Sequence, residues 1–173
     1  MSNRDRLIRG SRFVVRAALV ANRFLLIAFV VGLVLSWIFP VPFVTLILQP
    51  NPGVAVLSAL TGMRLLIVIG IVMSVAADRL FVALSEVIAS VGAGDPFIIA
   101  NARRLQTIGW SLLVLQLLDI PGGLLGRFYP SMGSAAPSGT FDIGGWISVL
   151  MVFVLSRVFA AGSAMRDELE GTV

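Results

Sequence analysis

Apolar residues along this chain gather into four stretches, each long enough to form a helix that crosses a lipid bilayer. The first lies within a run of forty uncharged residues, 24–63, which can hold one crossing and part of a return, because about 20 helical residues span the hydrocarbon core. Prolines, glycines and charged residues separate the stretches and place the crossings near residues 24–40, 60–83, 105–125 and 143–163. The pattern predicts an all-α fold, a four-helix bundle of transmembrane helices in a single integral membrane domain, residues 1–173.

The helical pattern continues past three of the apolar stretches. Apolar residues recur at helical spacing in 80–91, polar residues begin the third helix around Asn101, and the fourth helix runs past Arg157 into a charged tail. Between the second and third helices, the glycines of residues 92–96 predict a stop and a restart, with Asp95 as N-cap and Pro96 as the first helical residue.

Two connections are predicted on the side of the membrane opposite the termini. Prolines at positions 40, 42, 50 and 52 indicate a turn after the first crossing, and the Ser, Gly and Pro content of residues 126–142 is typical of a surface loop.

The distribution of arginine predicts the orientation of these helices. Six arginines precede the first crossing, whose apolar run is too long for a secretory signal and is interpreted as a retained anchor. Short cytoplasmic loops are enriched in basic residues, and four crossings put both termini on the same, basic side. We therefore expect a multi-pass protein of the bacterial inner (cytoplasmic) membrane, with cytoplasmic termini and with helices 2, 3 and 4 extending into the cytoplasm.

Composition narrows the possible chemistry. Hydrophobic residues make up 58% of the chain, charged residues 13%, the mean hydropathy is +1.00, and neither cysteine nor histidine is present. Disulfides, thiol or imidazole nucleophiles and the common transition-metal ligands are therefore excluded. No phosphate-binding glycine motif follows a strand. We expect no cofactor and no enzymatic activity.

Four N-terminal arginines form one helical stripe at positions i, i+3, i+7 and i+14: Arg9, Arg12, Arg16 and Arg23. The predicted partner is the anionic lipid headgroup, since each basic residue near such a surface contributes about 1 kcal/mol. Docking of a protein is the alternative; direct nucleic-acid binding is not expected, because no aromatic residues interleave with the arginines.

A six-residue match suggests a charge pair. Residues 84–89 align with residues 155–160, at equivalent ends of the second and fourth helices, and the exchanged residues are Glu86 and Arg157. If the chain contains two parallel hairpins, these two side chains could approach each other. The match is equally consistent with chance, and Arg157 is alternatively a structural arginine that extends to the interface.

Small residues at four-residue spacing, such as Ala28, Gly32 and Ser36, allow close helix packing. Packing within one chain and formation of a homo-oligomer are both consistent with them.

One set of positions carries a family resemblance. The matching residues are Gly94, Asp95, Pro96, Phe97, Asn101, Arg104, Leu105 and Gly109, followed near the C-terminus by Gly162, Met165 and residues 168–173. From about residue 60 onward, the chain resembles a bacterial family of small four-helix integral membrane proteins of unknown function, with the pattern GxPF, N, RL, IG and a C-terminal G, L, TV or TI. Met165 stands where that family tends to have leucine. The resemblance implies an inner-membrane protein, similar to members often encoded beside a small helix-turn-helix regulator, and it supplies no catalytic residues.

The leading hypothesis is a non-enzymatic interaction or regulatory membrane protein that docks a cytoplasmic partner, for which a helix-turn-helix regulator is one candidate. The alternative is a small transporter or channel subunit, which would require a polar path through the midplane. The central turns offer few polar groups for such a path, namely Ser36, Ser74, Ser111 and Gln116. A membrane enzyme ranks third, because Asp78 and Glu86 have no visible catalytic partner.

Overall fold

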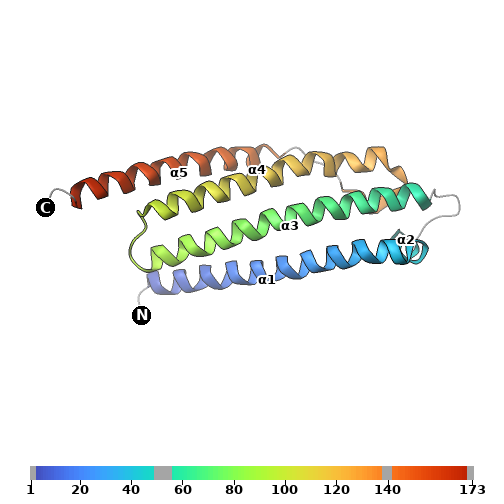
Figure 1. The fold of residues 1–173 in the computed structure, drawn as a ribbon, viewed down its shortest axis with the longest axis horizontal. Helices are drawn as coiled ribbons and strands as arrows, with labels where there is room; N and C mark the ends of the chain where they lie inside the picture. The colour runs from blue at the N-terminus through green and yellow to red at the C-terminus, as the bar shows by residue number, and fades with distance from the viewer. Residues whose placement is uncertain (1–2, 49–55, 138–141, 171–173) are drawn as a thin grey trace.

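The protein consists of long helices joined by short connections (Figure 1). The structure, a computed structural model, describes residues 3–48, 56–137 and 142–170. Its elements are α1 (Asn3–Ile38), α2 (Pro40–Leu48), α3 (Val56–Gly92), α4 (Ile99–Phe128), the short 3₁₀ helix η1 (Pro130–Ala135) and α5 (Ile143–Glu170). The described residues contain no strand, so the predicted all-α class is confirmed.

Four of the helices, α1, α3, α4 and α5, are long and apolar enough to cross a membrane. The 37 residues of α3 span about 55 Å at 1.5 Å per residue, well beyond a hydrocarbon core of roughly 30 Å. Large apolar side chains remain exposed along these helices, among them Phe24 at 70% and Leu150 at 66%. Lipid is the solvent that accepts such a surface, and the chain is a multi-pass membrane protein.

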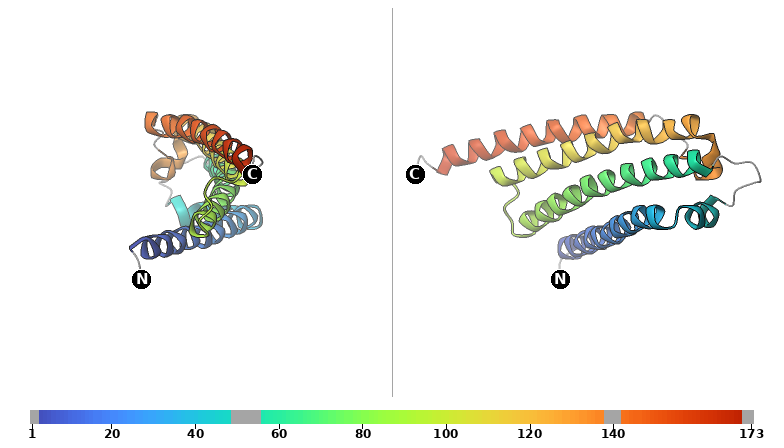
Figure 2. Two further views of the ribbon diagram at one scale, coloured as in Figure 1. Left: turned by 90° about the vertical axis from the view of Figure 1, so that its left-hand side faces the viewer. Right: turned by 45° about the vertical axis from the view of Figure 1, so that its right-hand side comes forward.

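The helices stand in an open, curved row (Figure 2). Within the described residues the backbone of α1 approaches that of α3, α3 approaches α4 and α4 approaches α5. The backbones of α1 and α4, of α1 and α5, and of α3 and α5 do not come close to each other. The predicted four-helix bundle is therefore wrong as a description of the packing. Lipid tails are as apolar as the helix faces, so burial of apolar area gives little reason for the row to close.

Glycines facing aromatic rings set the distance between neighbouring helices. A Cβ atom on Gly70 of α3 would lie 2.8 Å from the ring of Phe29 on α1, and one on Gly109 of α4 would lie 3.1 Å from the ring of Phe153 on α5. Both distances are shorter than van der Waals contact, so the rings occupy space that only glycine leaves open. The α3 and α4 helices instead share an apolar cluster formed by Ala83, Leu105 and Ile108, against which Val152 and Phe159 of α5 also pack.

The start of α1, the end of α5 and the α3–α4 connection lie together at one end of the row (Figure 1), which we call the terminal end. The opposite end, the α2 end, holds α2 and η1. There Val44 of α2 packs with Ala59 and Leu60 of α3, and Met132 of η1 is buried beside Gly62.

Two predicted connections need correction. The first crossing ends before Pro40 as expected, but residues 40–48 form a helix rather than a turn, because proline suits the first turn of a helix. Pro50 and Pro52 fall outside the described residues. The predicted surface loop 126–142 is not a simple loop over residues 126–137 either: α4 continues to Phe128 through Pro121, and η1 packs onto α3. Residues 138–141 fall outside the described residues.

Candidate functional site at the α3–α4 connection

The α3–α4 connection begins with a glycine turn. Gly94 has φ +89°, a left-handed conformation that side chains rarely adopt. The Gly94 N–H donates to the Val91 carbonyl at 3.2 Å and the Asp95 N–H donates to the Ser90 carbonyl at 3.2 Å. This pair of bonds is the Schellman motif, which satisfies carbonyls at the end of a helix.

The predicted roles of Asp95 and Pro96 are wrong. Helix α4 begins at Ile99 after the extended residue Ile98, and no side chain caps it. A proline forces the preceding residue into an extended conformation, which carries the chain away from α3 before it can turn into the next helix. The Asp95 carboxylate instead forms an ion pair with Arg166 of α5.

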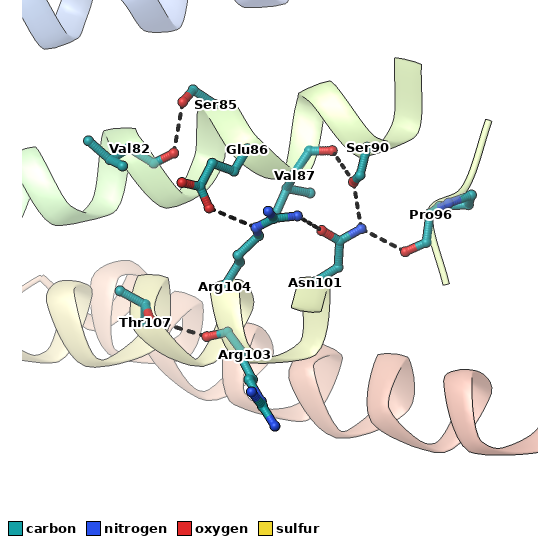
Figure 3. Close-up of polar contacts among 10 residues, drawn as sticks. All are labelled: Val82, Ser85, Glu86, Val87, Ser90, Pro96, Asn101, Arg103, Arg104 and Thr107. Carbon is teal, nitrogen blue, oxygen red and sulfur yellow. Dashed lines mark hydrogen bonds and ion pairs between the residues drawn. The ribbon is translucent and has the colours of Figure 1, made fainter. Parts of the chain in front are cut away.

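Asn101 forms the centre of a polar network (Figure 3). Its side chain is fully buried, and its Nδ2 donates to Ser90 Oγ at 2.6 Å and to the Pro96 carbonyl at 2.8 Å. Its Oδ1 accepts a hydrogen bond of 2.9 Å from Arg104 Nη1. One side chain therefore connects the end of α3, the connecting segment and the first turns of α4.

Arg104 extends this network to α3. Its Nε lies 2.8 Å from Oε2 of Glu86, with the carboxylate half exposed. Ser90 Oγ in turn donates to the Val87 carbonyl at 2.8 Å. Figure 3 shows Arg103, the neighbour of Arg104, directed away from α3.

The connecting segment also contacts α5. The Phe97 ring lies 5.2 Å from the Phe159 ring between centroids, and a Cβ on Gly162 would lie 3.1 Å from Phe97. Deeper in the row, Leu105 is buried against α3, and Gly109 accommodates the ring of Phe153. The eight family-like positions therefore lie along one joint that holds α3, α4 and α5 in register.

The polar groups of this joint are used in contacts with one another. The described residues contain no cluster of carboxylates that could hold a metal ion. Arg104 links Glu86 and Asn101 by one hydrogen bond to each. The arrangement fixes the geometry of the α3–α4 connection.

The candidate pair of Glu86 and Arg157 is not formed. Glu86 pairs with Arg104, while Arg157 is exposed on α5, a helix whose backbone does not come close to that of α3. In a helical hairpin, residues at similar distances from the turn lie opposite each other. Glu86 on α3 therefore meets Arg104 on α4, whereas Arg157 lies on α5.

The arginine stripe divides into two groups. Arg12 Nη2 donates to the Ala89 carbonyl of α3 at 3.3 Å, and Arg23 Nε lies 2.8 Å from Asp78 Oδ1, beside the bond of 2.9 Å from Asn22 Nδ2 to the Ser74 carbonyl. Two of the four arginines therefore hold α1 against α3. Arg9 and Arg16 are exposed, and their binding of lipid headgroups stays a prediction.

A second polar site, at the α2 end, was missed by the sequence reasoning. Arg64 of α3 donates from Nη2 to the Ser36 carbonyl at 2.6 Å and from Nε to Ser36 Oγ at 3.2 Å. Its guanidinium also lies 4.0 Å from the centre of the Trp37 ring. The available signal was Pro40, which has no N–H to donate to the carbonyl four residues earlier, that of Ser36.

Helix lengths and apolar surfaces together define a helical integral membrane protein. Residues 66–173 match the family described as "Protein of unknown function (DUF2975)", and the chain belongs to that family. No curated protein and no solved structure matches the chain. The family assignment confirms the resemblance to an uncharacterised family; the matched span contains all eight family-like positions.

Proposed function

We propose that this chain is a non-enzymatic interaction or regulatory protein of the bacterial inner membrane that docks a cytoplasmic protein at its terminal end. The observation that carries the proposal is the fully buried Asn101, whose three hydrogen bonds order the α3–α4 connection. Such order favours a docking surface, because a surface that is already ordered loses less conformational entropy when a partner binds.

The surface beside this network is accessible. Ala89, Ala93 and Gly94 are exposed at the end of α3, and the Asp95–Arg166 and Glu86–Arg104 ion pairs are partly exposed next to them. Charged groups at the rim of an interface contribute mainly to specificity and association rate. A helix-turn-helix regulator is the partner we favour for this surface.

The alternative function, a small transporter or channel subunit, draws less support from the contacts. Gln116 Nε2 donates to the Asp142 carbonyl at 3.3 Å, the Ser74 carbonyl accepts from Asn22, and Ser36 interacts with Arg64. These groups contribute to packing between segments, whereas a solute path needs polar groups that face a continuous passage.

Membrane orientation is the first expected outcome. Fusion of a green fluorescent protein after Val173 should give a fluorescent product, because the arginine-rich terminal end is expected to face the cytoplasm. Alkaline phosphatase inserted after Pro137 should be active, and the same enzyme fused after Val173 should be inactive. The reverse pattern would place the docking surface outside the cytoplasm and contradict the proposal.

Site-specific photocrosslinking in the native host tests the docking itself. A benzophenone amino acid at Ala93, on the exposed connection, should crosslink one cytoplasmic protein in stoichiometric amount. The control position is Val41, which is 57% exposed on α2 at the opposite end, and it should give no such product. Crosslinking only to lipid or to further copies of this chain at Ala93 would exclude a cytoplasmic protein partner at this surface.

A further inference from the structure

A groove lies between α4 and α5 near the terminal end, on the side of α4 that faces away from the Asn101 network. Its volume is about 510 Å³, within the range of small-ligand sites. Its walls include Arg103 and Gln106 of α4 and Arg157 of α5. The aromatic pair Trp110 and Phe153 also lines it, with an edge-to-face geometry and 5.4 Å between ring centres.

Two cations face this groove without a balancing anion. Neither Arg103 nor Arg157 forms an ion pair among the described residues, although other arginines there do. None of the residues that line the groove is acidic. An arginine beside an apolar membrane-exposed surface is costly unless an anion accompanies it, so the two guanidinium groups favour an anionic ligand.

Polar and apolar groups are separated along the groove. Arg157 follows Phe153 by one helical turn, and Arg103 precedes Trp110 by two turns, so both arginines lie roughly 6 to 10 Å closer to the terminal end than the aromatic pair. Trp110 is 55% exposed, so the apolar part of the groove is open to the surroundings of the protein. This polarity matches a molecule with a charged head and apolar tails.

We propose that the α4–α5 groove is a binding site for one anionic phospholipid. The phosphodiester lies between Arg103 and Arg157, whose planar guanidinium groups suit bidentate contacts with phosphate oxygens, and Gln106 donates a further hydrogen bond. The acyl chains pass over Trp110 and Phe153. This site is separate from the N-terminal arginine stripe and does not depend on a protein partner.

Quenching of Trp110 fluorescence by brominated lipid acyl chains tests the proposal. The full chain with Trp37→Phe and Trp146→Phe keeps Trp110 as its only tryptophan. It is reconstituted into phosphatidylcholine bilayers that contain increasing fractions of either brominated phosphatidylglycerol or brominated phosphatidylcholine. Phosphatidylglycerol is expected to bind beside Trp110 about 25-fold more tightly than brominated phosphatidylcholine, since each arginine contributes roughly fivefold. Arg157→Gln should reduce the preference about fivefold, and Arg103→Gln/Arg157→Gln should abolish it.

Two further variants separate the site from general attraction to a basic protein. Arg6→Gln/Arg79→Gln removes the same charge from exposed positions outside the groove and should keep the preference. Ala160→Phe fills the groove with both arginines intact and should weaken phosphatidylglycerol binding while leaving quenching by brominated phosphatidylcholine unchanged.

Three results would overturn the proposal. Equal quenching of the unmodified groove by the two lipids would show no selectivity, and a preference that survives Arg103→Gln/Arg157→Gln would place the anionic lipid elsewhere. If millimolar glycerol phosphate in solution removed the preference for phosphatidylglycerol, the groove would be a site for a soluble anion, with no role for its apolar part.

Discussion

Replacement of Asn101 by leucine should lower the free energy of unfolding by about 3 kcal/mol, the largest effect we expect from any single polar substitution in this chain. Leucine has a similar volume but removes three hydrogen bonds, from a side chain that is fully buried. The Pro96 carbonyl and Arg104 Nη1 then lose their partners. Steric trapping in bicelles, which measures unfolding of a membrane protein without denaturant, gives the difference directly.

A matched control is available on the same helix. Thr107 is exposed, and its Oγ1 donates only to the Arg103 carbonyl one turn earlier, at 3.1 Å. Thr107→Val should therefore change the free energy of unfolding by less than about 0.5 kcal/mol. If Asn101→Leu were as mild as Thr107→Val, the network would not be what holds the α3–α4 connection, and that connection would not be a preformed docking surface.

The helices themselves were predictable because hydrophobicity is a local property of the chain. Each apolar stretch corresponds to a helix in the structure, and the end of the first at Pro40 follows from the missing proline N–H. The order in which helices pack is not local. It depends on pairs such as Gly70 with Phe29 and Gly109 with Phe153, and no hydropathy pattern indicates which ring meets which glycine.

The same distinction explains the candidate site. Positions around Asn101 were found because they match a family, but sequence reasoning assigned each of them a separate structural role, such as a helix boundary at Gly94 and Pro96. Their common role depends on a hairpin that brings Glu86 opposite Arg104 and leaves Arg157 on the far side of α4. A repeat of six residues suggested the wrong partner, since a similar local sequence does not specify which helices are neighbours.

At the α2 end, Arg64→Met should lower the free energy of unfolding by about 2 kcal/mol. Ser36 is fully buried, and its carbonyl would lose the hydrogen bond of 2.6 Å from Arg64 Nη2. An unsatisfied carbonyl in an apolar environment costs about 1 to 3 kcal/mol. The lost contact with the Trp37 ring adds to this loss. Arg127→Met, at an exposed arginine of α4 toward the same end, should have little effect in the same steric-trapping measurement.

A double-mutant cycle with Pro40 distinguishes the reason for this loss. Pro40→Ala supplies a backbone N–H four residues after Ser36, in the position from which a regular helix would satisfy that carbonyl. In the Pro40→Ala background, Arg64→Met should therefore cost about 1 kcal/mol less than in the natural chain, a coupling that such cycles resolve for interacting residues. An equal cost in both backgrounds would mean that Arg64 acts through its other contacts, those with Ser36 Oγ and the Trp37 ring. The predicted coupling means that Arg64, on the neighbouring helix α3, donates the hydrogen bond to the Ser36 carbonyl that Pro40 cannot donate.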